Sequence, residues 1–209
     1  MNDSINNLNC TKCTRLSNFI ELIKVDYPNY HNKPVQSFGC NPALVLIVGL
    51  APGLHGANAT GRPFTGDQSG NLLHKALYKY GFSSQAKSIS INDNLRLINC
   101  RITNAVRCLP PLNKPSHQEI NNCSSYLFQE IKNSKPKLII CLGNIAHNAV
   151  CRVLNLKGID FKHGNKHKLG KICILDSYHP SRLNINTNRL TESMFFSIFM
   201  FAKNYIKNI

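Results

Sequence analysis

Acidic residues are scarce in this sequence of 209 amino acids, which contains 10 Asp and Glu against 25 Lys and Arg. The resulting formal charge of +15 attracts polyanions, so nucleic acid is the first partner that the composition suggests. The chain is also rich in Asn and Ile, and AT-rich coding DNA would account for part of the lysine content. Because such a bias does not remove Asp and Glu, we keep nucleic-acid binding as a hypothesis.

Long apolar runs are absent as well. No uncharged apolar stretch reaches about 18 residues, which excludes a membrane-spanning helix, and the opening MNDSINNLNCTKC lacks the features of a secretory signal. Neither GxGxxG nor GxxxxGK[ST] occurs, which argues against a nucleotide-binding enzyme. We therefore expect a soluble, cytoplasmic protein with no membrane partner, folded as one domain over residues 1–209.

Helical and strand-like patterns alternate along the chain, which is typical of an α/β fold with a mostly parallel sheet. The run ALVLIV has no polar residue, as expected of a buried parallel strand. Further strands are predicted in SISIND, CRITNAV, KLIICLG and KICILDSYHPSR. Helices are predicted over residues 14–26, 69–80, 144–154 and 190–206, and after a capping box of Ser116 and Glu119.

Polar loops marked by glycine or proline follow three of these strands, after Val48, Val106 and Ser177. In an open parallel sheet, ligands bind at the carboxyl ends of the strands. The three loops are therefore predicted to converge on one site, although the fold does not specify its chemistry.

The nine cysteines are an odd number, which favours reduced thiols and metal ligation over a disulfide framework. Cys10 and Cys13 form a CxxC motif, and Cys108 and Cys123 are separated by fourteen residues. A zinc site would more usually have a second CxxC or nearby histidines, whereas an iron-sulfur cluster accepts thiolates from separate loops. The alternative is that the second pair are a loop thiol and a helix thiol without metal.

Four blocks of the chain, in order, resemble the uracil-DNA glycosylase superfamily, and most closely its family 5, the UDGb type. They are GLAPGLHGANATGRPFTGDQSG, ITNAVRCLPPLNKPSHQEINNC, LGNIAHNA and SYHPSRLNINTNRLTE. The resemblance implies a three-layer α/β/α fold with a four-stranded, mainly parallel sheet. It also implies a monomer that removes uracil, and related deaminated bases such as hypoxanthine and xanthine, from DNA. The cluster it implies is of the 4Fe-4S type, held by Cys10, Cys13, Cys108 and Cys123.

Two positions in the first block bear on this resemblance. Family 4 enzymes carry a glutamate where this chain has Leu50, so no carboxylate is available there to activate water, as is typical of family 5. Small residues such as alanine are usual where this chain has Gly53 and Leu54, and Leu54 is a candidate for narrowing the pocket.

An enzyme that excises a base must evert it from the duplex into a pocket. Glycines in the first loop allow the backbone to approach that base. By resemblance Phe64 stacks on it, although a core position is the alternative for this ring. Asn104 reads the edge of the uracil and contributes to catalysis, although such a residue often forms a turn. The predicted base-binding residues are Gly49, Leu50, Ala51, Gly53, His55, Phe64, Asn104 and His179.

Among the candidate catalytic residues, His179 has the clearest chemical role. Cleavage leaves negative charge on the departing base, and a histidine that donates a hydrogen bond to uracil O2 would stabilise it. His55 is a second candidate, for positioning water or phosphate. Asp67 is predicted either to assist the sugar cation or the attacking water, or to cap the next helix.

The HPSRLN block lies where this superfamily has its minor-groove wedge, so Leu183 is predicted to fill the gap left by the base. The predicted DNA-binding residues are Arg62, Ser181, Arg182, Leu183, Asn184 and Arg189. The lysines between residues 157 and 171 are interpreted as a solvated hairpin or loop. No lysine stands in a motif as an amine nucleophile, so we expect a monofunctional enzyme. The competing hypothesis is a non-catalytic iron-sulfur protein that binds DNA or senses redox state.

Overall fold

A mixed sheet forms the centre of the fold in the computed structural model, which describes residues 7–208. The predicted domain also includes residues 1–6 and 209, which lie outside the described ones. The strand order is β1-β3-β2-β4-β6-β5. The strands are β1 (Phe38–Gly39), β2 (Val45–Gly49), β3 (Cys100–Asn104), β4 (Leu138–Leu142), β5 (Lys166–Leu169) and β6 (Ile172–Ser177).

The four central strands β3, β2, β4 and β6 are parallel to one another, as the sequence predicts. The sheet is larger than four strands because β1 and β5 add antiparallel edges, on β3 and β6 respectively. The lysine-rich segment is a hairpin in part, since β5 and β6 pair with each other. Successive residues of β2 face opposite layers, and Ile47 packs below the sheet while Leu46 packs above it. Both faces are therefore buried, which explains the unbroken apolar run.

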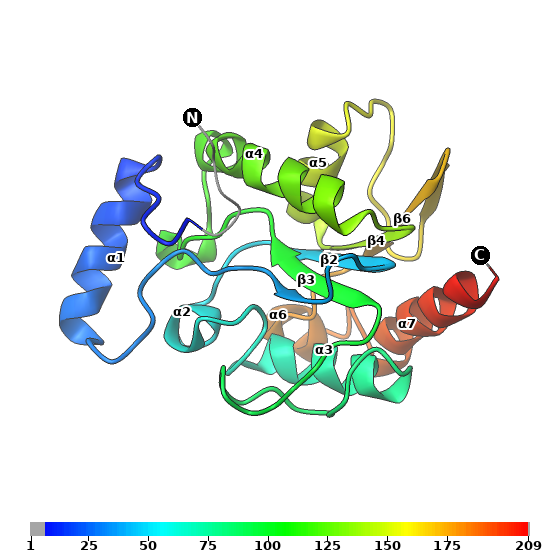
Figure 1. Ribbon diagram of the computed structural model, residues 1–209, viewed down its shortest axis with the longest axis horizontal. Helices are drawn as coiled ribbons and strands as arrows, with labels where there is room; N and C mark the ends of the chain where they lie inside the picture. Colours follow the sequence, from blue (N-terminus) through cyan, green and yellow to red (C-terminus); the bar gives the residue numbers. More distant parts are fainter. Residues whose placement is uncertain (1–6, 209) are drawn as a thin grey trace.

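Helices cover both faces of the sheet, which confirms the three-layer architecture. Figure 1 shows α4 and α5 over one face and α3 and α7 under the other. Within the described residues, no helix combines the length and the apolar character needed to cross a membrane. The helices are α1 (Thr14–Asp26), α2 (Ala57–Thr60), α3 (Gln68–Lys79), α4 (His117–Ser134), α5 (Asn144–Val153), α6 (Arg182–Asn186) and α7 (Glu192–Lys207).

Side-chain caps begin α4, as predicted, and α7, for which no cap was predicted. Ser116 accepts a hydrogen bond from the backbone of Glu119, whose carboxylate accepts one from the backbone of Ser116, so the capping box is present. Thr191 accepts from Met194 at the start of α7. Each cap satisfies backbone N–H groups that the first helical turn leaves unpaired, and contributes about 1 kcal/mol.

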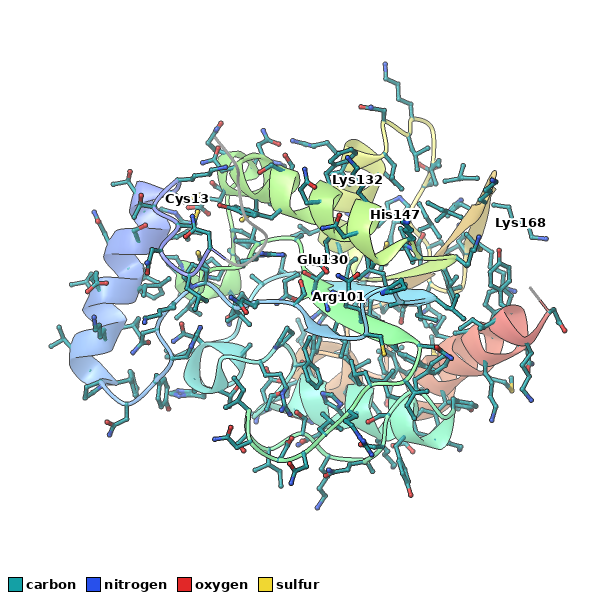
Figure 2. All side chains as sticks on the ribbon, viewed as in Figure 1. Cys13, Arg101, Glu130, Lys132, His147 and Lys168 are labelled. Atoms are coloured by element: carbon teal, nitrogen blue, oxygen red, sulfur yellow. The ribbon has the colours of Figure 1, made fainter. Side chains whose placement is uncertain are left out.

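A buried ion-pair cluster joins α4 to the sheet. Glu130, on α4, is 1% exposed and pairs with Arg101 of β3 and with Arg107, whose Nη2 lies 3.0 Å from the carboxylate. Figure 2 shows Glu130 and Arg101 facing each other between the helix and the sheet. Removing one partner would leave a buried charge unpaired, so the cluster holds α4 in register over β3.

The segment Ser88–Asp93 is not a strand, contrary to the prediction from SISIND. The carboxylate of Asp93 accepts hydrogen bonds from the backbone N–H groups of Ile89, Ser90 and Leu95. Because one side chain satisfies these donors, the segment needs no strand partner and forms a loop instead.

Candidate active site

The loops after β2, β3 and β6 meet at the carboxyl edge of the sheet and enclose a cavity of about 260 Å³. This volume is below the usual range for a drug-sized ligand and suits one small ring. Of the predicted site residues, those that line the cavity are Leu50, Ala51, Gly53, Phe64, Asp67, Asn104, His179 and Ser181. The structure therefore brings together residues that are more than a hundred positions apart in the chain.

Phe64 forms one wall of the cavity. Its ring centroid lies 6.0 Å from that of His179, and the two ring planes are tilted by 32°. The side chain is only 7% exposed and also packs into the apolar core below the sheet. Phe64 is therefore both a wall of the cavity, as base stacking requires, and a part of the core, which was the alternative prediction. Its backbone is left-handed, with φ of 53°, which is uncommon for a bulky residue and aims the ring at the cavity.

Asn104 ends β3 and lines the cavity. It is 6% exposed, and its Oδ1 is buried without a hydrogen-bond partner among residues 7–208. Leaving a buried acceptor unpaired costs about 1–3 kcal/mol. The atom is therefore poised to accept a hydrogen bond from a bound ligand.

Gly49 lies beside Asn104 in the parallel register of β2 and β3. A Cβ atom added to Gly49 would lie 2.6 Å from the Phe64 ring and would also overlap Asn104 Oδ1. The absence of a side chain here is what allows both residues to occupy the cavity wall.

His179 follows β6, and its backbone is held in place by neighbouring residues. Its carbonyl oxygen accepts hydrogen bonds from the backbone N–H of Ser181 and from the Nδ2 of Asn184, each at 2.8 Å. Burial lowers the pKa of His179 to about 4, because the charged imidazolium would lose its hydration. The ring is therefore neutral near pH 7 and carries one N–H donor.

Asp67 caps α3 and also reaches the cavity. Its Oδ1 accepts a hydrogen bond of 2.8 Å from the backbone N–H of Gly70, which confirms the capping interpretation. A Cβ on Gly53 would lie 3.6 Å from Oδ2, so the second oxygen faces the first loop. Burial raises the pKa of Asp67, whereas the backbone hydrogen bonds from Gly70 and Ser69 oppose that shift.

His55 lies outside the cavity, contrary to the prediction that it contacts the base. The side chain is exposed, its Nδ1 lies 3.0 Å from the hydroxyl of Tyr30, and its ring packs edge-on against Tyr27. These two tyrosines, from the end of α1 and the loop after it, hold the imidazole in the adjoining groove.

Arg62 is not available to DNA, which corrects the prediction that it contacts phosphate. Its side chain is 4% exposed, and its guanidinium donates to Asp93 Oδ1 at 2.7 Å, Ser88 Oγ at 3.1 Å and the Ile91 carbonyl at 2.8 Å. Arg62 thus fastens the loop over residues 88–93 to the protein.

The α6 segment presents the other predicted DNA-binding residues beside the cavity. Leu183 is 72% exposed, and Arg182 and Arg189 are exposed as well. Arg182 Nε donates to Gln68 at 2.9 Å, and Ser181 caps α6. The amide of Asn184 is already bonded to the His179 carbonyl, so its observed contact positions that histidine.

Three further residues line the cavity but were not predicted from the sequence, namely Ala57, Ser69 and Asn113. Asn113 comes from the proline-rich loop after β3, and its place in that loop was the available signal. Its left-handed backbone, with φ of 56°, turns it toward the first loop.

The four cysteines predicted to bind a cluster lie in one region, with Cys13 at the start of α1 and Cys123 on α4. Cys108 and Cys123 belong to the apolar core between the sheet and helices α4 and α5, and Cys10 and Cys13 pack against that core. Asn122 Nδ2 donates a hydrogen bond of 3.3 Å to Cys13 Sγ, the kind of contact that tunes a sulfur ligand.

The four thiols fit a metal group in their chemistry. Burial, together with the neighbouring thiols, raises the pKa of Cys108 and brings that of Cys123 to about 11, so the bare thiolates are unfavourable. The thiols of Cys10, Cys13 and Cys123 all contribute to raising the pKa of Cys108, which places the four sulfurs near one another. Four thiol donors from separate parts of the chain are a ligand set that fits an iron-sulfur cluster.

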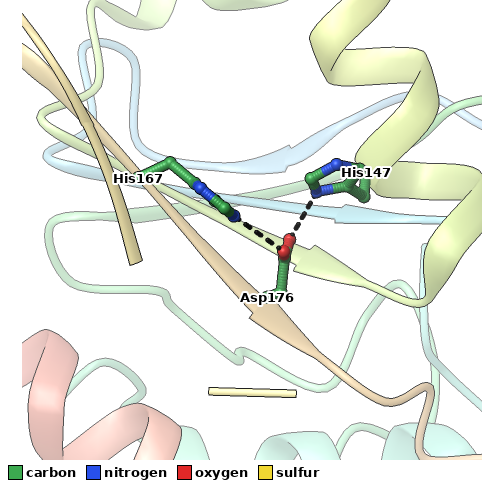
Figure 3. Close-up of side chains that lie close together, drawn as sticks. All are labelled: His147, His167 and Asp176. Carbon is green, nitrogen blue, oxygen red and sulfur yellow. Dashed lines mark hydrogen bonds and ion pairs between the residues drawn. The ribbon is translucent and has the colours of Figure 1, made fainter. Parts of the chain in front are cut away.

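A separate polar cluster lies away from the cavity, between α5 and the β5–β6 hairpin (Figure 3). Asp176 accepts at Oδ1 from His147 Nδ1, 2.8 Å away, and at Oδ2 from His167 Nε2, 3.2 Å away. The other nitrogen of His147 lies 3.1 Å from the carbonyl of Ile159. These contacts form a hydrogen-bonded network around the buried carboxylate. The network ties the hairpin to α5.

Comparison with known proteins matches residues 36–201 to the Uracil DNA glycosylase superfamily. The chain is 41% identical to a type-5 uracil-DNA glycosylase of Pyrobaculum aerophilum, with 90% of this chain and 86% of the relative covered. It is 42% identical to a type-5 uracil-DNA glycosylase of Thermus thermophilus, covering 83% and 81%. A type-4 uracil-DNA glycosylase of Archaeoglobus fulgidus is 27% identical, covering 83% and 77%.

Proposed function

This chain belongs to the uracil-DNA glycosylase superfamily, and on that premise we propose that it hydrolyses the N-glycosidic bond of uracil in DNA and leaves an abasic site. The observation that carries the proposal is the single cavity shared by Phe64, Asn104 and His179. A stacking ring, an amide and a neutral imidazole are what recognition and release of a planar base require.

Recognition of the everted base falls to Phe64 and Asn104. The Phe64 ring offers an apolar face for stacking, a contact of about 1–3 kcal/mol per base. The unpaired Oδ1 of Asn104 accepts a hydrogen bond from the N3–H of uracil, and its Nδ2 donates to O4. Binding thus satisfies an acceptor that the free protein leaves unpaired.

His179 acts on the departing base. Bond cleavage gives the sugar oxocarbenium character and leaves negative charge on the uracil ring. The neutral imidazole donates a hydrogen bond to O2, where that charge develops, so it stabilises the transition state more than the bound substrate. Asp67 Oδ2 is the nearby carboxylate oxygen that supports the sugar cation or orients water.

Leu50 lines the cavity and bears on the range of bases that the site accepts. Because this position carries no carboxylate, the site reads bases mainly by shape, stacking and the Asn104 amide. We extend the proposed range to hypoxanthine and xanthine on this ground. No lysine lines the cavity among the described residues, so water is the nucleophile and the enzyme is monofunctional.

The assay of this function uses duplexes that carry uracil, hypoxanthine, xanthine or thymine opposite each normal base. Free base and alkali-labile abasic sites are expected from the uracil duplexes, without strand breaks before alkali is added. Strand breaks before alkali would contradict the monofunctional mechanism. Tight DNA binding without base release from any duplex would favour the non-catalytic iron-sulfur protein instead.

We also propose that Cys10, Cys13, Cys108 and Cys123 hold a 4Fe-4S cluster. The support for this assignment is that four thiols from three parts of the chain lie near one another, because an iron-sulfur cluster accepts thiolates from separate loops. When bound, the cluster supplies a rigid covalent tie between the CxxC segment and the loop after β3. Asn122, through its contact with Cys13, would stabilise a thiolate ligand.

The purified protein is expected to absorb near 400 nm, and Cys123→Ser is expected to abolish that band and lower stability. Cys40→Ser is the matched control, because Cys40 lies near Leu97 and outside the thiol cluster. Stoichiometric zinc with no visible absorbance in the wild type would contradict the assignment, as would a band that survives in Cys123→Ser.

All proposed site residues come from one chain, so a monomer is sufficient for the reaction. The excess of basic residues supports association with DNA, and we place the protein in the cytoplasm, bound to the nucleoid.

A further inference from the structure

The loop between β3 and α4 carries an unusually exposed leucine. Leu112 is 86% exposed, the highest value among the large apolar side chains of the described residues. Its backbone is left-handed, with φ of 55° and ψ of 22°, and the next residue, Asn113, is left-handed too. Two adjacent strained residues that are not glycine are retained where the conformation has a use.

The tip of this loop is firmly held. Cys108, at its start, is 8% exposed, and Pro110 and Pro111 restrict the backbone that follows. At its end, the carbonyl of Lys114 accepts a hydrogen bond of 3.1 Å from Arg15. The leucine is therefore presented in one direction by an anchored loop.

The segments that carry Leu112 and Leu183 line the same groove beside the cavity. Asn113, the neighbour of Leu112, lines both the cavity and the adjoining groove, and Arg182, the neighbour of Leu183, lines the same groove. The two exposed leucines thus come from different segments, the loop after β3 and α6, and each is one residue away from a side chain of this groove.

We propose that Leu112 is a second apolar wedge, which packs against the base stack of duplex DNA opposite Leu183 while the target nucleotide is everted. The inference rests on the proposed glycosylase function. Everting a base exposes apolar faces of its neighbours, and proteins that unstack duplexes insert apolar side chains at such steps. Contact with these faces would cover a side chain that the protein itself leaves in water. Leu112 is a positioning residue, because it touches neither the reacting bond nor the target base.

Two substitutions of Leu112 distinguish the effect of its apolar surface from the effect of its backbone conformation. Leu112→Asn suits the left-handed backbone but removes the apolar surface, whereas Leu112→Met keeps an apolar side chain of similar size. A wedge is needed only where a stack must be opened, so uracil in single-stranded DNA should not depend on it.

The test measures single-turnover release of uracil from a duplex and from the same oligonucleotide as a single strand. Leu112→Asn is expected to slow the duplex reaction about tenfold and to leave the single-strand reaction within about twofold, since only the first requires unstacking. Leu112→Met should remain close to the wild type. Leu22→Asn is the control, because Leu22 is 67% exposed on α1 and lines neither the cavity nor the groove.

A second readout uses 2-aminopurine placed opposite uracil, whose fluorescence rises when the partner base is unstacked. Binding of the wild type is expected to raise it, and binding of Leu112→Asn to raise it less. Equal losses on both substrates, or duplex activity and fluorescence equal to the wild type, would overturn the wedge. If the wild type releases no base from either substrate, the glycosylase proposal fails, and the fluorescence still decides the role of Leu112.

Discussion

Replacing His179 with alanine is expected to slow uracil release about 10²–10³-fold, the usual effect of removing one donor from a site of developing negative charge. Binding to a uracil duplex should persist, because the change removes an interaction that strengthens only as the bond breaks. Single-turnover excision and an equilibrium binding assay measure the two quantities separately. Since the pKa of His179 is about 4, its neutral form predominates from about pH 5 to 8, and the ring should impose no inflection there.

His55→Ala is the matched control for this experiment. His55 is exposed, bonded to Tyr30 and absent from the cavity lining, so its loss should change the excision rate by less than about threefold. A large loss in His55→Ala with normal activity in His179→Ala would exchange the proposed roles of the two histidines.

Gly49→Ala is expected to reduce excision about 100-fold while the protein remains folded, because a displacement of about 1 Å at reacting groups costs that much. The added Cβ would lie 2.6 Å from the Phe64 ring and would overlap the Asn104 side chain. Both residues must move, so the stacking wall and the amide lose their positions together. The excision rate and thermal unfolding measured on the same preparation separate this local effect from loss of the fold.

Gly53→Ala provides the contrast within the same loop. There the nearest atom to an added Cβ is Asp67 Oδ2 at 3.6 Å, an ordinary contact, so the loss of excision should be clearly smaller than in Gly49→Ala, although Gly53 also lines the cavity. Equal activity in the two alanine variants would show that close packing around Gly49 is not what positions the site.

Local patterns in the sequence were sufficient for most of the fold. The apolar runs before the loops predicted the four parallel strands, and the Ser116 capping box marked the start of α4. These signals act over a few residues, so they predict the strand or helix even when the segments that pack against it are unknown. SISIND failed because its backbone donors are satisfied by the side chain of Asp93.

The errors at the site have a common physical origin. Arg62 and His55 both stand in a loop that resembles a DNA-contacting motif, but their surroundings are supplied by distant segments. Arg62 is buried and paired with Asp93, and the His55 ring is hydrogen-bonded to Tyr30 outside the cavity. A pattern of neighbouring residues does not predict contacts with side chains from distant segments.

The layered α/β fold, the basic charge and the loops that build the site can be predicted from short stretches of the chain, because periodicity, caps and glycine signals are local. The three-dimensional fold was needed to show that Phe64, Asn104 and His179 share one cavity, that Asn104 keeps an unpaired acceptor there, and that Leu112 is left exposed. These facts depend on how strands distant in the sequence align at one edge of the sheet. That alignment is set by packing across the whole core, beyond the reach of any single segment.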